Sequence, residues 1–117
     1  NLHIIYVENK IENIDDLKNR NFIAFSGIGN PDSFFNILLE NNIKIIKQIT
    51  YPDHFQFTEE NYKSLFKEAN SNMCDLITTE KDYVRIDDKY KQNFNFTKLN
   101  TILTNKELLE KEIKQLF

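Results

Sequence analysis

The sequence predicts an α/β domain in which a mostly parallel β-sheet is flanked by helices. Short runs of β-branched and aromatic residues, typical of strands, alternate along the chain with segments of helical periodicity. One run, Phe22–Ser26, is nearly all apolar, as expected of a strand that is buried on both faces. The length of 117 residues suits one domain, and ten Phe and five Tyr supply side chains for its core. Strands that alternate with helices are typical of parallel sheets.

The N-terminal part is expected to hold two strands. Leu2–Val7, with the sequence LHIIYV, is predicted as the first because β-branched and aromatic residues dominate it. The polar segment 13–19, NIDDLKN, is interpreted as a turn or a single helical turn. Phe22–Ser26 follows as the second strand, and GIGNP leads from it into a helix.

That helix is predicted over Pro31–Glu40. Asn30 suits the N-cap, because its side chain can accept a hydrogen bond from a free backbone N–H, and Pro31 suits the first helical position. At the other end, Asn41 or Asn42 is expected to take the left-handed conformation that ends many helices.

A third strand and a second long helix are predicted next. Ile43–Ile49 is strongly β-branched and is therefore assigned as a strand. Thr58 is expected to cap the helix that follows. The buried stripe of this helix has the spacing i, i+3, i+4, i+7 and consists of Tyr62, Leu65, Phe66 and Ala69.

The C-terminal part is expected to hold two more strands and a final helix. Asp75–Thr78 is predicted as a strand, 79–86 (TEKDYVRI) as a turn or short helix, and Asn93–Leu99, which alternates, as the last strand. Thr104 and Glu107 form the pattern of a capping box. The apolar stripe of that final helix is Leu109, Ile113, Leu116 and Phe117. This order of elements predicts a small Rossmann-like domain that spans the whole chain.

The composition excludes several classes of protein. A net charge of −3, from 18 acids and 15 bases, argues against a nucleic-acid-binding protein, which usually carries a basic excess. Cys74 is the only cysteine, which excludes a disulfide framework and a cysteine-based metal cluster and favours a reducing compartment such as the cytosol. Because no apolar run approaches the roughly 18 residues that span a bilayer, we expect a soluble chain.

Gly27–Asn30, GIGN, lies between a strand and a helix, where a phosphate-binding loop would lie. Asp32 stands where the dinucleotide fingerprint would need a third glycine, and Pro31 removes a backbone donor. We therefore favour a tight turn that needs the backbone freedom of glycine. A nucleotide P-loop also needs a Gly-Lys pair, which neither of the two glycines of the chain supplies.

Thr78–Asp82, TTEKD, follows a predicted strand at the sheet edge that ligands favour in α/β folds. In one interpretation, Thr78, Thr79 and Lys81 hold a phosphate. In the alternative, which the residues alone favour, Thr79 caps a short helix and Lys81 pairs with a nearby carboxylate.

Pro52–His54 also follows a predicted strand, and His54 is one of only two histidines in the chain. A loop histidine at such an edge can be a general base or a charge partner near neutral pH; the alternative is an ordinary loop residue. Neighbours rarely face each other in an extended chain, so we do not expect Asp53 to orient His54 directly. The sequence assigns no metal ligand and no cofactor-binding residue to this chain.

Three blocks together resemble the C-terminal part of tetraacyldisaccharide 4'-kinase, the lipid A kinase of Gram-negative bacteria. They are AFSGIGNPDSFF (Ala24–Phe35), YPDHFQFTEE (Tyr51–Glu60) and LITTEKDYVRI (Leu76–Ile86). The chain departs from the family pattern at three positions. Ser26 replaces a usual alanine, Phe55 stands where many members have a second histidine, and Arg85 replaces a common lysine.

The resemblance implies a two-domain enzyme of which this chain would be the C-terminal domain. The N-terminal domain of the family carries the P-loop, the acids that bind magnesium, and a surface that associates peripherally with the cytoplasmic face of the bacterial inner membrane. A short β-ribbon links the two domains, and Leu2–Val7 is expected to belong to it. On this view ATP and Mg²⁺ are bound by the N-terminal domain, and the chain alone is inactive.

The resemblance also implies a reaction and one catalytic residue. The family transfers the γ-phosphate of ATP to the 4'-hydroxyl of a tetraacylated glucosamine disaccharide 1-phosphate, which gives lipid IVA. The histidine of the Pro-Asp-His motif, here His54, is expected to support an aspartate base of the N-terminal domain. Two alternatives remain open from the residues: a stand-alone α/β binding or regulatory module, and a small enzyme that acts on a phosphorylated substrate.

Overall fold

Four parallel strands form the central sheet of the computed structural model, which describes the backbone of residues 7–103 and the side chains of residues 10–99. They are β2 (Asn21–Ser26), β3 (Lys44–Thr50), β4 (Asp75–Thr79) and β5 (Phe94–Thr97). Their spatial order is β3-β2-β4-β5, and every neighbouring pair is parallel. The prediction of a mostly parallel sheet is therefore confirmed.

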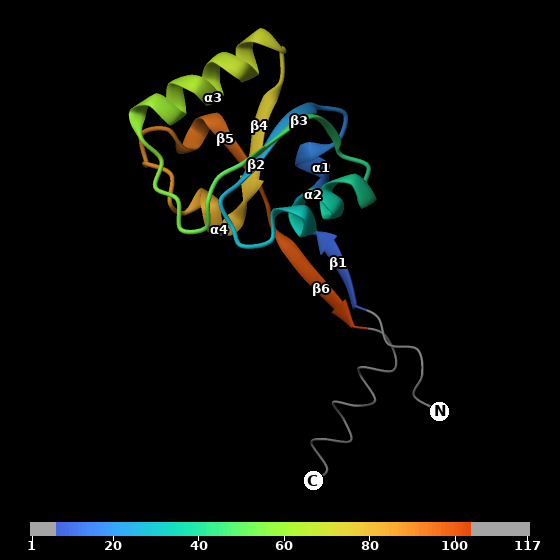
Figure 1. Ribbon diagram of the computed structural model, residues 1–117. Coiled ribbons are helices and arrows are strands. Elements are labelled where there is room, and N and C mark those ends of the chain that lie inside the picture. Colours follow the sequence, from blue (N-terminus) through green and yellow to red (C-terminus); the bar gives the residue numbers. More distant parts are fainter. Residues whose placement is uncertain (1–6, 104–117) are drawn as a thin grey trace, which may run out of the picture.

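Helices cover both faces of this sheet (Figure 1). The helical segments are α1 (Ile14–Leu17), α2 (Pro31–Glu40), α3 (Glu59–Ser71), α4 (Glu80–Tyr83) and the 3₁₀ turn η1 (Lys91–Asn93). Because side chains alternate along a strand, Phe22 and Ala24 of β2 lie in one core cluster with α1 and α2, whereas Ile23 and Phe25 lie in the other with α3. The two clusters make a three-layer α/β/α arrangement.

The strand order places a topological switch point between β2 and β4. After β2 the chain crosses through α2 to β3 on one side, and after β3 it returns through α3 to β4 on the other side. The connections after β2 and β4 therefore diverge, and ligands of open α/β sheets bind in the crevice that such divergence leaves at the carboxyl edge.

The structure confirms the two long helices where the sequence places them. Asn30 accepts a hydrogen bond from the Ser33 N–H at 3.4 Å, and α2 spans the predicted residues. Asn42 takes the left-handed conformation with φ of 61°. Thr58 caps α3 through a capping box with Asn61. In the predicted stripe of α3, Tyr62, Leu65 and Ala69 are buried and Phe66 is half-buried.

The two ends of the described chain differ from the prediction. Within the described residues the first strand is β1 (Val7–Ile11), which continues past the predicted end at Val7 and pairs antiparallel with β6 (Leu99–Leu103) in a two-stranded ribbon that projects from the body (Figure 1). The prediction of a single strand over Asn93–Leu99 is wrong, because the chain changes its partner strand at Lys98. Before it β5 pairs with β4, and after it β6 pairs with β1. Residues 2–6 and the predicted final helix lie outside the described residues.

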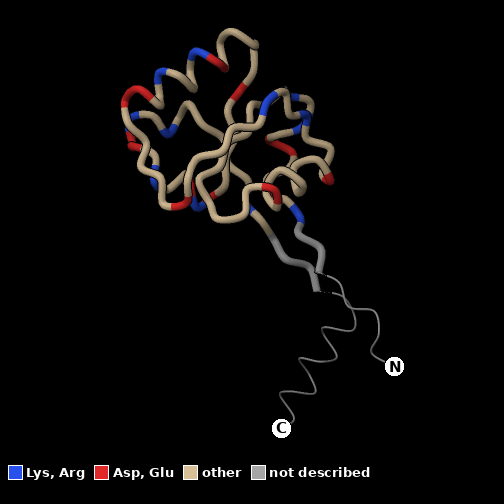
Figure 2. Tube along the Cα trace, viewed as in Figure 1, with Lys and Arg blue, Asp and Glu red and all other residues tan. Residues whose placement is uncertain are grey.

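Acidic and basic residues are interspersed along the described part of the chain (Figure 2). Several form exposed pairs, such as Lys47 with Glu68 at 3.1 Å and Lys18 with Asp15 at 3.0 Å. Such pairs stabilise the fold little, because water screens them. Within residues 7–103, no helix has the length and apolar character needed to cross a membrane.

Candidate functional site

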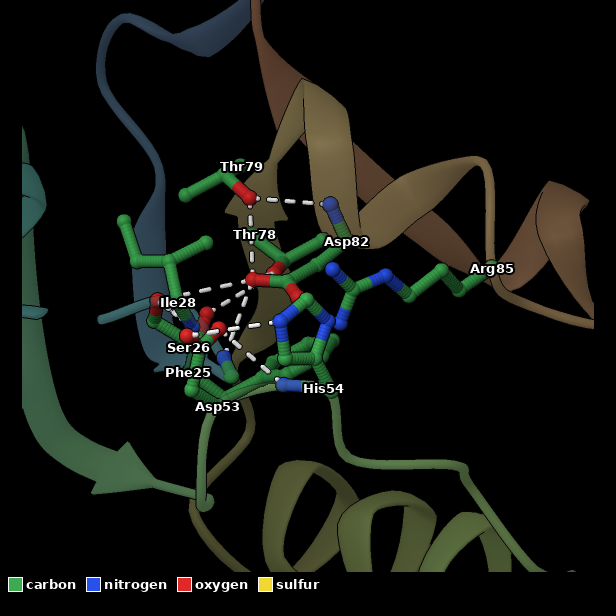
Figure 3. A network of polar contacts seen from close by, with 10 residues as sticks. Phe25, Ser26, Ile28, Asp53, His54, Thr78, Thr79, Asp82 and Arg85 are labelled. Carbon is green, nitrogen blue, oxygen red and sulfur yellow. Dashed lines mark hydrogen bonds and ion pairs between the residues drawn. The ribbon is translucent and has the colours of Figure 1, made fainter.

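The turns that follow β2, β3 and β4 meet at the carboxyl edge of the sheet (Figure 3). The Tyr51 N–H donates to the Ser26 carbonyl at 2.8 Å, which ties the turn after β3 to the end of β2. The Gly27 N–H donates to Asp82 Oδ2 at 3.0 Å, which ties the turn after β2 to α4. Three segments that the sequence analysis treated separately are thus one connected site.

Asp82 is the centre of this network. Its side chain is buried, and its Oδ2 accepts hydrogen bonds from the Gly27 N–H and from hydroxyl groups at the ends of β2 and β4. The hydroxyl donors are Thr79 at 2.9 Å and Ser26 at 3.4 Å, and the Thr78 hydroxyl, which donates to the Phe25 carbonyl, lies 3.5 Å away. A buried carboxylate is costly unless hydrogen bonds replace its hydration, so these donors explain how the sheet edge tolerates the charge.

The second carboxylate oxygen of Asp82 has a different environment. Oδ1 lies 3.8 Å from Arg85 Nη1, at ion-pair distance, and neither atom has a hydrogen-bond partner among the described residues. Both atoms are buried from solvent. The guanidinium is therefore held near Asp82 by charge and not by a directed hydrogen bond.

The structure decides between the two interpretations of TTEKD. Thr79 caps α4, because its hydroxyl accepts the Asp82 N–H at 3.0 Å. Thr78 is buried and donates to the Phe25 carbonyl at 2.8 Å. Both hydroxyls have internal partners, so the phosphate interpretation is wrong for them. The expected pair between Lys81 and a nearby carboxylate is wrong: no carboxylate of the described residues lies at ion-pair distance from Lys81, and Arg85 is the cation near Asp82.

The turn after β2 is structural for a reason other than the predicted one. Neither Gly27 nor Gly29 has a positive φ, so backbone freedom is not what the turn requires. A Cβ on Gly27 would lie 3.3 Å from Asp82 Oδ1, and 3.5 Å from both the Pro52 carbonyl and Phe55 Cβ. Gly27 is thus needed for close approach of three segments.

His54 lies at the third position of a hydrogen-bonded turn. The Phe55 N–H donates to the Pro52 carbonyl at 3.1 Å, and His54 has φ of 62°, as in a type II turn. Its side chain is 81% exposed. A left-handed conformation costs a residue with a Cβ about 1–2 kcal/mol, and such strain concentrates at functional sites.

An aromatic cluster anchors the turn that carries His54. The ring of Phe55 stacks on Tyr51 at 4.5 Å between centroids, and Phe57 contacts both rings and Phe25 of the core. Burial raises the pKa of the Tyr51 phenol, so this hydroxyl stays protonated near neutral pH and does not act as a base. These ring contacts hold the turn in place and leave the His54 side chain at the surface.

The expectation that Asp53 does not orient His54 directly assumed an extended chain, and that assumption is wrong. The chain is not extended there, because His54 is left-handed, and its imidazole turns back toward the preceding residue. Asp53 Oδ2 lies 3.7 Å from His54 Nε2, and Asp53 Oδ1 accepts the His54 backbone N–H at 3.0 Å. The carboxylate is near enough to attract a protonated imidazole but makes no hydrogen bond with it.

His54 and Arg85 line one open cavity of about 440 Å³. Its other lining residues are Phe55, Gln56, Phe57 and Asp87. Figure 3 shows the guanidinium directed toward the imidazole. An exposed imidazole in such a cavity can exchange a proton with, or place a charge beside, a group that enters from outside. In residues 7–103, no group of three or more His, Cys, Asp or Glu side chains is arranged to hold a metal ion.

Sequence reasoning did not assign Asp82 or Arg85 to the site. One signal was available for Asp82: apolar strands end in hydroxyl residues at Ser26 and Thr78, and such residues often serve a buried polar group. Nothing local marked Arg85, which reaches the site only through the fold.

Comparisons with known proteins give a consistent result. The model of the family described as Tetraacyldisaccharide-1-P 4'-kinase matches residues 3–117. The chain is 36% identical over 104 residues to the tetraacyldisaccharide 4'-kinase of Pelagibacter ubique and 39% identical over 106 residues to that of Rickettsia canadensis. It is 44% identical over 72 residues to the enzyme of the same name from Bartonella tribocorum.

These matches cover most of this chain but little of the relatives. They include 87%, 88% and 62% of the chain, and 33%, 31% and 21% of the respective relatives. The chain thus spans a third or less of the length of the curated relatives it matches. No solved structure gives a significant match.

Proposed function

Because the chain belongs to the tetraacyldisaccharide-1-phosphate 4'-kinase family, we propose that it is the C-terminal domain of such a kinase. The complete enzyme transfers the γ-phosphate of ATP to the 4'-hydroxyl of a tetraacylated disaccharide 1-phosphate. It works as a peripheral protein at the cytoplasmic face of the bacterial inner membrane. The N-terminal domain of the same protein is the partner that completes the active site.

The observation that carries this proposal is the placement of His54. Its imidazole is exposed in an open cavity, and the turn beneath it is fixed by aromatic packing and by hydrogen bonds to β2. A histidine with only a structural role would be expected to bury its ring or to bond it. We assign His54 as the residue that orients and charge-stabilises an aspartate base of the other domain.

This assignment suits phosphoryl transfer, in which enzymes act mainly by positioning groups and stabilising charge. An imidazolium beside a carboxylate favours the ionised carboxylate, which can then accept the proton of the attacking hydroxyl.

The described residues do not fit ATP and magnesium themselves. In the turn after β2, the Gly27 N–H is donated to Asp82 and the Ile28 N–H to Ser26 Oγ at 3.3 Å, so neither is free for a phosphate. The buried carboxylate of Asp82 beneath this turn also repels an anion. We therefore infer that the nucleotide and its metal are bound by another part of the kinase.

The test is the kinase activity of the complete protein that contains this chain, with His54 replaced by Asn. Asparagine tolerates the left-handed conformation, so His54→Asn removes the imidazole without adding backbone strain. We expect kcat to fall by about 10²–10⁴-fold with little change in Tm or in the KM for ATP. Met73→Asn is the matched control, because Met73 is also exposed and left-handed but precedes β4 at the opposite sheet edge.

An unchanged kcat in His54→Asn would show that His54 is an ordinary loop residue. Tight ATP binding by the 117-residue chain alone, measured by calorimetry, would instead favour the small independent enzyme. Absence of kinase activity from the complete wild-type protein would favour the binding or regulatory module.

A further inference from the structure

We propose that Asp82 is a positioning residue for His54, a role that rests on the kinase function proposed above. Asp82 itself does not line the cavity that His54 faces. It reaches the turn that carries His54 along two routes, one through the Gly27 backbone and one through the Arg85 guanidinium.

The first route is a packed backbone contact. Asp82 Oδ2 holds the Gly27 N–H at 3.0 Å, and the Pro52 carbonyl and Phe55 Cβ border the space beside Gly27, each 3.5 Å from where a Cβ on that residue would lie. Those two residues flank the turn on either side of His54. The position of Gly27 therefore sets the space that both ends of the turn have beside the strand end.

The second route is the ionic interaction between Asp82 and Arg85. Arg85 lines the cavity beside His54, and its Nη1 lies 3.8 Å from Asp82 Oδ1. Among the described residues, Asp82 is the ionic partner of the Arg85 side chain. Without the Asp82 charge, the guanidinium would lose its anchor and would place an unbalanced positive charge in the wall that His54 faces.

The geometry predicts that Asp82→Asn breaks the interaction with Arg85 and keeps the one with Gly27. The Gly27 N–H and the Thr79 and Ser26 hydroxyls surround the position of Oδ2, and because the N–H can only donate, the amide oxygen of Asn must take it. The amide NH₂ is then forced into the position of Oδ1, opposite the Arg85 donor. A donor facing a donor repels, so the guanidinium moves while the Gly27 contact remains.

The experiment is a double-mutant cycle on kcat in the complete kinase, with Asp82→Asn, His54→Ala and both together. If Asp82 acts through His54, Asp82→Asn lowers kcat by about 10–10²-fold in the wild-type background, because small misplacements of a positioned group have effects of that size. In the His54→Ala background the same change lowers kcat by less than about twofold. Asp75→Asn is the control, because Asp75 is an exposed partner of Arg20 at the other end of β4.

Equal losses of kcat in the two backgrounds would overturn the proposal, because a merely structural effect does not depend on His54. That result would leave the kinase function intact, whereas an inactive wild-type protein would overturn the function itself. If Asp82→Asn does not fold, Arg85→Gln takes its place in the double-mutant cycle with His54→Ala. A loss of kcat in Arg85→Gln that disappears in the His54→Ala background, and that is absent from Arg85→Lys, supports the proposal. A loss of kcat that is equal in both backgrounds overturns it.

Discussion

The two glycines of the turn after β2 should respond very differently to alanine. At Gly27, an added Cβ would lie 3.3 Å from Asp82 Oδ1, closer than ordinary van der Waals contact. Retreat of Asp82 is opposed by the hydrogen bonds from Gly27, Thr79 and Ser26 that hold its other oxygen. At Gly29, the Cβ would meet only Asp53 Oδ2, at 3.5 Å, and that carboxylate is on the surface.

The magnitudes follow from two opposing effects. Overpacking of a buried site costs about 1–3 kcal/mol. Replacing glycine by alanine at a compatible φ stabilises by about 0.4–1 kcal/mol, because it reduces the freedom of the unfolded chain. Both glycines lack a positive φ, so both receive this gain, but only Gly27 incurs the packing cost. We expect Gly27→Ala to destabilise by about 1–2 kcal/mol and Gly29→Ala to stabilise by up to about 1 kcal/mol.

Calorimetry or urea denaturation of the two variants measures this difference. For a domain of this size about 1 kcal/mol corresponds to roughly 4 °C in Tm, so the melting temperatures should move in opposite directions by several degrees. A destabilisation of Gly29→Ala as large as that of Gly27→Ala would refute the reasoning. It would mean that backbone freedom, and not close approach, is what the turn requires.

Two further substitutions test the packing and the electrostatics of the α3 side of the sheet. Tyr62→Phe should lower the free energy of unfolding by about 1–3 kcal/mol, because the buried Tyr62 hydroxyl accepts the Asp87 N–H at 3.0 Å and the N–H would lose its partner; an unchanged urea midpoint would contradict this. Hydrogen bonds from Tyr90 and Lys89 lower the pKa of the Glu59 carboxyl below its ordinary value of 4.5. A carboxyl with a depressed folded pKa stabilises above its unfolded pKa and loses that contribution as the pH falls through the folded one, so Glu59→Gln should weaken the fall of Tm below about pH 4.5. Identical acid dependence in both proteins would show that the contact does not contribute.

The sequence by itself determined the long helices and most of the strands. Asn30 and Pro31 mark the start of α2, and Thr58 marks that of α3, because caps act within one helical turn. The apolar run at Phe22–Ser26 likewise predicted a strand buried on both faces. Such signals are local, so they can be recognised before the tertiary contacts are known.

Strand pairing at the ends of the described chain required the tertiary structure. Lys98 separates β5 from β6 only because the chain leaves one partner strand there and meets another. A run of alternating residues shows that a strand is favoured, but it does not show which strand it pairs with or where the partner ends.

In the functional site, too, the sequence predicted one residue and only the tertiary structure placed the others. His54 was a candidate from the sequence, through its place after a strand and its motif, and its catalytic role remains a prediction. The connection between Asp82 and Gly27 spans 55 positions in the chain, and the approach of Arg85 to the cavity of His54 was equally invisible in the sequence. Parallel strands bring their carboxyl ends to one edge of the sheet, so side chains from distant segments meet there. Their contacts depend on the order of the strands in space, which no local pattern of residues encodes.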